Sequence, residues 1–207
     1  MAIQTSLITF KNKIDGVVGQ KSFGRWTLRQ NTKPRNPKTT KQQAHRQKFA
    51  LVGGFAGRIS AVVNQTFKNS QRTAFSEFIK VNFDNIVGGT APNYELLYEN
   101  AVVSRGNLDQ PYNPSASVDS GTLSVTWTDN SGIGNALGTD QAAILVYNPS
   151  KEQAVYTFDA GKRSDRMASI TVPSVWNGDN VEVWFFMKSA TESNFFSDSY
   201  YLGSLSV

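Results

Sequence analysis

Hydrophobic and polar positions follow different patterns in successive parts of the chain, and the first part predicts β-hairpins. Residues 3–30 alternate short apolar pieces with Gly16, Gly19 and Gly24. Glycines at this spacing permit tight turns between short strands, which favours one or two hairpins. Residues 30–37 are polar and basic and contain two prolines. Because proline fixes its own φ and disfavours helix in the residue before it, this piece is predicted to be an extended arm.

A helix is predicted to begin at the end of this arm. Thr40 with Gln43, or Thr39 with Gln42, has the spacing of a helix cap, so either threonine is a candidate. Downstream, apolar residues recur at spacings of three and four, as on one helical stripe: Phe49, Val52, Ala56, Ile59 and Val63. Three glycines at 53, 54 and 57 lie inside the same helix, and each lowers helix stability by about 1 kcal/mol relative to alanine. We therefore expect either another backbone close to this helix or a break near residue 53.

A second, shorter helix is predicted over residues 70–83. Ser70 is the candidate cap. The apolar face of this helix would consist of Ala74, Phe75, Phe78 and Ile79. The connector at residues 94–106 has mixed apolar residues and is predicted as a strand.

From residue 108 onward the pattern changes to period two, which is typical of half-buried strands. Leu123, Val125 and Trp127 alternate with polar residues, and further short apolar runs are separated by turns every 8–12 residues. Seven or so strands over 100 residues suggest an immunoglobulin-like or fibronectin-III-like sandwich. Trp127 and Trp184 are the expected core aromatics. A glycine-containing stretch after Trp127 is expected to be a loop.

The predicted fold class is therefore α+β: an N-terminal β-hairpin and extended basic arm, two helices, and a C-terminal immunoglobulin-like sandwich. We expect two domains, at residues 1–106 and 107–207. The first holds 16 basic and 5 acidic residues, a net charge of +11, and the second 5 and 11, a net charge of −6. Opposite charges on the two parts could attract one another head-to-tail between neighbouring copies.

Most of the positive charge lies in residues 1–48, which hold 11 basic residues and one acidic residue. Two interpretations stay open: contact with nucleic-acid phosphates, with aromatic stacking, or docking of the arm on a neighbouring subunit. The candidate residues for either contact are Lys21, Arg25, Trp26, Arg29, Lys33, Arg35, Lys38, Lys41, Arg46 and Lys48. The zinc-finger, RNP and basic-zipper patterns of known nucleic-acid-binding proteins do not occur in the sequence.

Composition excludes several kinds of chemistry. The sequence contains no cysteine, which excludes disulfides, thiol catalysis and Cys-ligated metals, and its single histidine excludes multi-His sites. His45 lies among basic residues, so we expect a solvated or interface histidine. No apolar run approaches the roughly 20 residues that span a bilayer, and residues 1–10 do not resemble a signal peptide. We expect no enzyme activity, no cofactor, no metal and no membrane contact.

A ligand- or carbohydrate-binding function of the sandwich is a third interpretation. It would use exposed aromatic residues, for which Trp176, Tyr200 and Tyr201 are the candidates.

Several short motifs together resemble those of an uncharacterised protein family of about 200 residues. They are the Gly-rich basic start, Asn36-Pro37-Lys38-Thr39 with Arg46 and Phe49, then Ser104-Arg105-Gly106, Val125-Thr126-Trp127 and Asn177-Gly178-Asp179. This resemblance covers nearly the whole chain and implies an occurrence in Bacteroidetes and their phages and mobile elements. It carries over no catalytic residues. The Asn-Pro-x-Thr…Gln…Arg…Phe element is also similar to elements of phage structural proteins.

The leading hypothesis is a non-enzymatic structural protein of a phage virion, such as a capsid, decoration, neck or tail component. Its expected partners are copies of itself and other virion proteins, and it would reside in the host cytoplasm before assembly. The alternative is a nucleic-acid-binding protein that uses residues 11–48.

Overall fold

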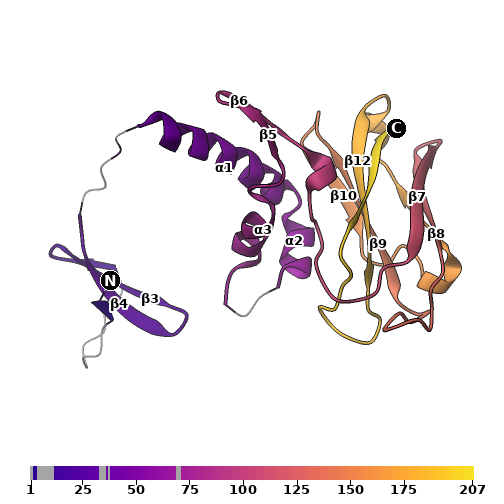
Figure 1. Cartoon of the computed structure of the whole chain (residues 1–207), viewed down its shortest axis with the longest axis horizontal. Helices are drawn as coiled ribbons and strands as arrows, with labels where there is room; N and C mark the ends of the chain where they lie inside the picture. The colour runs from indigo at the N-terminus through magenta and orange to yellow at the C-terminus, as the bar shows by residue number, and fades with distance from the viewer. Residues whose placement is uncertain (1, 4–11, 33–35, 37, 69–70) are drawn as a thin grey trace. The chain divides into compact units, whose positions relative to one another are not determined.

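The computed structural model describes residues 2–3, 12–32, 36, 38–68 and 71–207. The chain forms two compact units, Met1–Gln42 and Gln43–Val207. Figure 1 follows the chain from its N-terminus to its C-terminus through the helices and strands of both units. The boundary predicted after residue 106 falls inside the second unit and stays a prediction.

The first unit contains a small antiparallel sheet. Its strands are β1 (Ala2–Ile3), β2 (Asn12–Ile14), β3 (Val17–Ser22) and β4 (Arg25–Gln30), in the order β1-β4-β3-β2. Gly16 and Gly24 lie in the β2–β3 and β3–β4 turns with φ of +70° and +79°, which only glycine adopts without strain. The predicted hairpins are thus confirmed for the described residues. Lys33, Pro34, Arg35 and Pro37 of the predicted arm lie outside the described residues.

Three α-helices follow: α1 (Thr40–Arg58), α2 (Ser60–Thr66) and α3 (Ala74–Asn82). Of the two candidate caps for α1, Thr39 is used, because its Oγ1 accepts a hydrogen bond from the Gln42 amide at 3.3 Å. The predicted stripe continues from α1 across Ile59 into α2, and four of its five residues are buried. Phe49 is the exception, with 44% of its surface exposed.

Two explanations were expected for the glycines of α1, a break near residue 53 or another backbone close to the helix, and neither holds for the described residues. The helix is continuous through residues 53–57 and ends only at Arg58. In the described part of the chain, no backbone of another element lies within 4 Å of a Cβ built at these positions. A Cβ at Gly54 or Gly57 would meet nothing within 4 Å, and one at Gly53 would meet only the rings of Phe75 and Phe49.

The second predicted helix begins later than expected. Thr73, rather than Ser70, caps α3, and its hydroxyl accepts a hydrogen bond from the Ser76 amide at 3.2 Å. Ser70 lies outside the described residues. Phe78 of the predicted apolar face is fully buried. Phe75 is 38% exposed.

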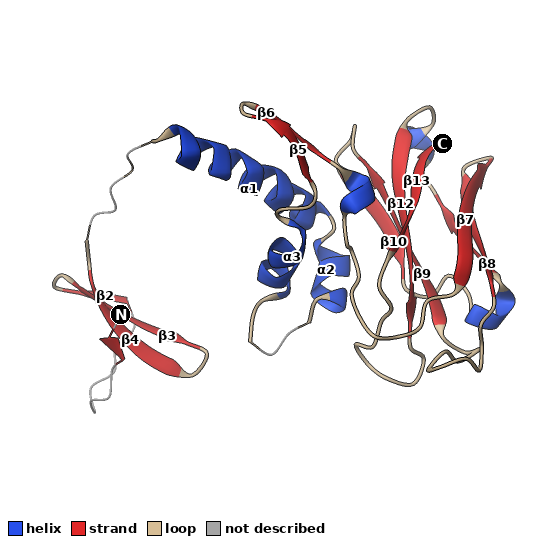
Figure 2. Cartoon of the chain, in the orientation of Figure 1, coloured by secondary structure: helices blue, strands red, loops and turns tan. Residues whose placement is uncertain are grey.

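The remaining strands lie in three antiparallel sheets, shown in red in Figure 2. A hairpin pairs β5 (Val87–Thr90) with β6 (Asn93–Leu96). A four-stranded sheet has the order β10-β9-β12-β13, and a three-stranded sheet the order β11-β8-β7. Their bounds are β7 Tyr112–Asp119, β8 Thr122–Thr128, β9 Gln141–Asn148, β10 Gln153–Thr157, β11 Met167–Thr171, β12 Asn180–Lys188 and β13 Tyr200–Ser206. Short 3₁₀ turns occupy Tyr98–Asn100, Arg163–Asp165 and Ser174–Trp176.

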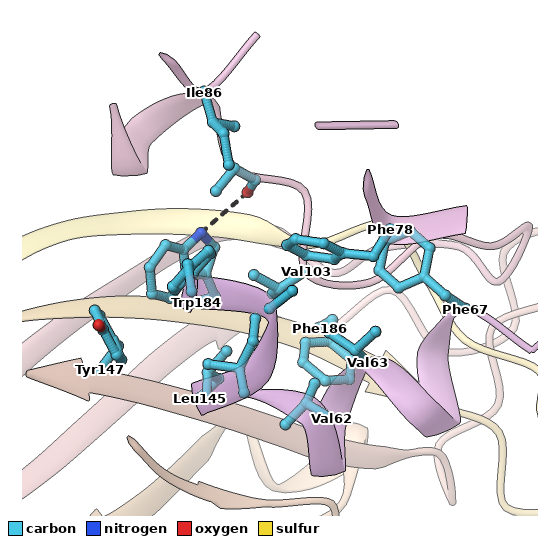
Figure 3. Close-up of a cluster of buried hydrophobic side chains, with 14 of the residues drawn as sticks. Val62, Val63, Phe67, Phe78, Ile86, Val103, Leu145, Tyr147, Trp184 and Phe186 are labelled. Carbon is cyan, nitrogen blue, oxygen red and sulfur yellow. Dashed lines mark hydrogen bonds between the residues drawn. The ribbon is translucent and has the colours of Figure 1, made fainter. Parts of the chain in front are cut away.

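The four-stranded sheet is buried on both faces. Successive residues of a strand point to opposite faces, and almost every residue of β9 and β12 is buried. One set, which includes Ile144, Val183 and Phe185, packs against the three-stranded sheet. The other set, which includes Leu145 and Trp184, packs against the helices, as Figure 3 shows. The second unit therefore has three layers and two hydrophobic cores, which share one sheet.

The strand predicted over residues 94–106 is confirmed only as far as Leu96. Residues 101, 103 and 104 are buried and Val102 is partly buried, and this stretch pairs with no described strand, because side chains satisfy its backbone. The Asn82 side chain accepts a hydrogen bond from the N–H of Val102 and donates one to its C=O. Thr66 donates to the Val103 carbonyl, and the Trp184 indole donates to the Ala101 carbonyl. A buried backbone needs such partners, and here three separate elements provide them.

Candidate interaction surfaces

One face of the N-terminal sheet is basic. Directly paired residues of antiparallel strands lie on the same face. Val18 of β3 pairs with both Lys13 of β2 and Arg29 of β4, and Ser22 of β3 pairs with Arg25. Lys13, Arg25 and Arg29 are all exposed. We call these three residues the basic face.

The opposite face of this sheet is apolar. Trp26 pairs with Lys21, whose ammonium lies 5.6 Å from the centre of the indole ring. Leu28, Val17 and Ile14 share this side by the same register. Ile14 is 55% exposed and Val17 38% exposed. The predicted site residues Lys21 and Trp26 thus form a cation–π pair on the side away from Arg25 and Arg29.

The predicted basic residues of α1 do not form one surface. Lys41 and Lys48 are seven residues apart and share a stripe, whereas Arg46 lies on a different side of the helix. Lys48 is half-buried, with its ammonium 5.0 Å from the centre of the Tyr94 ring. Lys38 is exposed just before the helix. Lys33 and Arg35 lie outside the described residues, so their predicted contacts stay predictions.

His45 is exposed on α1. Its ring centre lies 5.0 Å from that of Phe83. The ring centre of Phe83 lies in turn 6.5 Å from that of Phe49. The histidine therefore lies at the edge of a partly exposed aromatic cluster.

A concave surface that sequence reasoning missed runs along α1. One cavity of about 350 Å³ is lined by Gln47, Tyr94 and Pro92, and another of about 250 Å³ by Gly54, Tyr98 and Tyr147, among others. Both also include Ala50 and Leu51, so the cavities adjoin. We call the two together the tyrosine groove, with Ala50, Leu51, Tyr94, Tyr98, Tyr147 and Pro149 as its main lining residues.

Six residues of α1 line the groove, and they lie along one side of the helix: Gln47, Ala50, Leu51, Gly54, Phe55 and Arg58. The middle of this stripe is small, because Ala50 has a single methyl group and Gly54 has no side chain. The glycine therefore leaves open space beside Tyr98 and Tyr147.

Ionic groups lie at one end of the groove. Arg58 Nη2 and Glu152 Oε2 form an ion pair at 2.6 Å, although both side chains are more than half exposed. Burial raises the pKa of Tyr98 above its ordinary value, and the charges of Glu182 and Glu152 raise it further. Burial also raises the pKa of Tyr147. The two hydroxyls are also hydrogen-bonded to each other, which raises the pKa of Tyr98 further.

The tyrosine groove had no local signature in the sequence. Its two ionic residues are 94 positions apart, and its tyrosines come from β6, a 3₁₀ turn and β9. The spacing of Gln47, Ala50, Leu51, Gly54 and Arg58 was the one signal that could have indicated a second face of α1.

The prediction that Trp176 belongs to an exposed aromatic site on the sandwich is wrong. This residue is 1% exposed, and its indole donates to Gln153 Oε1 at 3.3 Å. Tyr200 and Tyr201 are half-buried. The predicted core positions Trp127 and Trp184 are confirmed, at 5% and 0% exposed.

A buried polar network lies at the base of the loop between β8 and β9. Arg163 is fully buried, and it donates to Asp140 Oδ2 at 3.0 Å and to Asn130 Oδ1 at 2.7 Å. The carbonyl of Arg163 in turn accepts a hydrogen bond from the Trp127 indole at 2.9 Å. These contacts join the loop to the core, which is a structural role.

In the described part of the chain, no group of three or more His, Asp and Glu side chains is placed to hold a metal ion. None of the described helices has the length and apolarity needed to cross a membrane.

Comparison with protein families identifies the chain. Residues 9–203 match a family of unknown function, DUF6266. The chain belongs to this family. This match fits the expected membership in an uncharacterised family of about 200 residues, whereas the motifs as family features and an occurrence in Bacteroidetes and phages stay predictions. No curated protein matches the chain.

Proposed function

We propose that this DUF6266 protein is a non-enzymatic structural protein that assembles with other copies of itself. One observation carries the proposal. Among the described residues of the first unit whose burial is given, Gly19 alone is buried, while Ile14, Val17 and Phe23 are exposed. A sheet without a buried core is marginally stable by itself, so it favours a partner surface.

Charge supports assembly between copies. Residues 1–42 hold nine basic residues and one acidic residue, whereas residues 107–207 carry a net charge of −6. Such an uneven distribution favours head-to-tail attraction between neighbouring molecules and disfavours contact between two first units.

The specific setting that we propose is a phage virion, as a capsid, decoration, neck or tail component. The Asn36-Pro37-Lys38-Thr39 element and its similarity to phage structural proteins support this setting. Mass spectrometry of purified phage particles is the test, and detection of the protein in stoichiometric amounts is the expected result. A protein found only in the soluble host fraction, and monomeric at high concentration, would contradict the proposal.

We further propose that β7–β13 form an immunoglobulin-like, fibronectin-III-like sandwich. The first, second and fifth of the seven strands make one sheet, and the third, fourth, sixth and seventh make the other. Trp127 of the first sheet stacks on Phe185 of the second at 5.0 Å, which supports the likeness to a sandwich with a tryptophan core.

Nucleic-acid binding is the second candidate function, and the basic face favours it. Lys13, Arg25 and Arg29 project from three adjacent strands to one side, where phosphates could contact all three. Each phosphate that a protein neutralises on duplex DNA contributes about −0.9 to the slope of log K against log salt.

The triple variant Lys13→Ala, Arg25→Ala, Arg29→Ala tests this function. If the basic face binds DNA, the salt slope becomes less steep by about 0.9 for each phosphate that the variant no longer neutralises. A control that removes Lys80, Arg105 and Lys188 from the second unit changes the net charge equally. Equal effects of the two triple variants would contradict a specific role of the basic face.

A further inference from the structure

The tyrosine groove has the shape of a binding site for an extended chain. Gln47 lines one of its cavities and Gly54 the other, and these residues are seven positions apart on α1. At 1.5 Å per residue, Gln47 and Gly54 are about 10 Å apart along the helix, and the two adjoining cavities, which share Ala50 and Leu51, together extend over at least this length. Aromatic side chains and prolines form the opposite wall, with Tyr94 and Pro92 at one end and Tyr98, Tyr147 and Pro149 at the other.

The chain itself contains a segment that matches this spacing. Residues 33–38 read Lys-Pro-Arg-Asn-Pro-Lys, with prolines at positions 34 and 37. Such a sequence favours the polyproline II helix, which has three residues per turn and rises about 3.1 Å per residue. Prolines three residues apart therefore lie on the same side, about 9 Å apart, and aromatic grooves bind segments of this type.

Two carboxylates lie in or near the groove and offer partners to a cationic segment. Glu152 lies in the wall, and Glu182 lies near enough to raise the pKa of Tyr98. The cations near the groove are Arg58, which is paired with Glu152, and Lys48, which lies over Tyr94.

Hydrogen-bond donors are also in place. A polyproline II segment has no internal hydrogen bonds, so its carbonyl groups need donors from the site. Residues with donor groups line the cavities: Gln47 with its amide, Arg58 with its guanidinium, and Tyr98 and Tyr147, whose hydroxyls are hydrogen-bonded to each other. The lysines and the arginine of the segment would find Glu152 and its neighbours as partners.

We propose that the tyrosine groove of one copy binds residues 33–38 of a second copy, with Pro34 in one cavity and Pro37 in the other. This inference rests on the proposed assembly function and names the surface that the basic arm meets. It also explains Gly54: a glycine at this point of α1 leaves room for a proline ring, although it weakens the helix.

A synthetic peptide with the sequence of residues 29–40 tests the groove directly. A dye-labelled peptide is titrated into the full-length chain that carries Pro34→Ala and Pro37→Ala, so that the arm of the chain itself does not compete. Fluorescence anisotropy measures binding. We expect saturable binding, and at least tenfold weaker binding of a peptide with both prolines replaced by alanine. Because this control peptide keeps every charge, equal binding of the two peptides would overturn the proposal.

A matched pair of variants on α1 tests the location. Gly54→Leu fills the cavity beside Tyr98, whereas Gly57→Leu adds the same side chain at a position that lines neither cavity. We expect Gly54→Leu to weaken peptide binding at least tenfold and Gly57→Leu to change it less than twofold. Circular dichroism checks that both variants keep the fold, and Tyr98→Phe, which removes only a hydroxyl donor, is a milder second variant. Equal binding by all of these variants would place the peptide elsewhere.

Sedimentation of the full-length chain separates this inference from the proposed function. The arm variant and the Gly54→Leu variant should each lose self-association, and their mixture should recover a two-chain species, because one copy keeps the arm and the other keeps the groove. If wild type and both variants assemble equally, the inference fails and the assembly function stands. If the peptide binds but the chain stays monomeric and is absent from particles, the groove stands and the assembly function fails.

Discussion

Trp184 and Phe185 are neighbours in β12, yet they belong to two different hydrophobic cores. The Trp184 ring lies 5.8 Å from that of Phe55 in α1. The Phe185 ring stacks on Trp127 of the other sheet at 5.0 Å. Both side chains are fully buried. A single strand therefore couples the packing of the helices to that of the sandwich.

This coupling predicts cooperative unfolding of residues 43–207. Trp184→Ala and Phe185→Ala should each lower the free energy of unfolding by about 3–5 kcal/mol, since each leaves a large cavity. In urea, far-UV circular dichroism and tryptophan fluorescence should report one shared transition for the wild type and for the Phe185→Ala variant. Separate transitions for helices and sheets would contradict a shared central sheet.

Gly57→Ala should stabilise the protein by about 0.5–1 kcal/mol. The position is an exposed helix interior where a Cβ meets nothing within 4 Å, and alanine loses less backbone entropy than glycine on folding. Gly106→Ala is the control, because a Cβ there would overlap the carbonyl oxygen of Phe196. Thermal unfolding should show a higher midpoint for the first variant and a lower midpoint for the second.

Arg163→Met should destabilise the fold by about 3–5 kcal/mol, because it leaves the buried Asp140 carboxylate without its cation. The added substitution Asp140→Leu should recover part of this loss, since two apolar side chains leave no unpaired charge. Lys162→Met, on the exposed neighbour, should change stability by less than about 0.5 kcal/mol. Urea denaturation of the wild type and the three variants measures these differences. A double variant that is less stable than Arg163→Met alone would contradict the role given to the pair.

The lowered pKa of Asp179 predicts that the free energy of unfolding falls in acid. Hydrogen bonds from Lys151 and Asn148 hold the pKa of this carboxyl below its ordinary value of 3.8. Because the folded pKa is the lower one, its contribution is present above pH 3.8 and is lost as the pH falls through the folded pKa. Asp179→Asn should therefore lose less stability than wild type between pH 5 and pH 2. Urea midpoints across this range measure the effect, which should shrink in high salt because the ion pair of Asp179 with Lys151 is partly exposed.

Local patterns were sufficient for the elements that depend on local physics. Thr39 marked the start of α1, and the stripe from Val52 to Val63 marked the buried side of α1 and α2. Gly16 and Gly24 marked the hairpin turns, and the alternation around Trp127 marked a strand with one buried face. Each of these signals arises from residues within a few positions of one another, where helix or strand periodicity decides which side chains share a face.

Tertiary structure decided what depends on residues far apart in the chain. The irregular backbone at residues 101–104 is stable because Thr66, Asn82 and Trp184 satisfy its polar groups, and no local pattern encodes three distant partners. The tyrosine groove likewise unites Gly54, Tyr98 and Tyr147 from separate elements. The sequence by itself thus determined the type of most elements and how charge divides along the chain. Packing decided where several of them begin and end and which surfaces face one another, because burial and cavity shape depend on all layers at once.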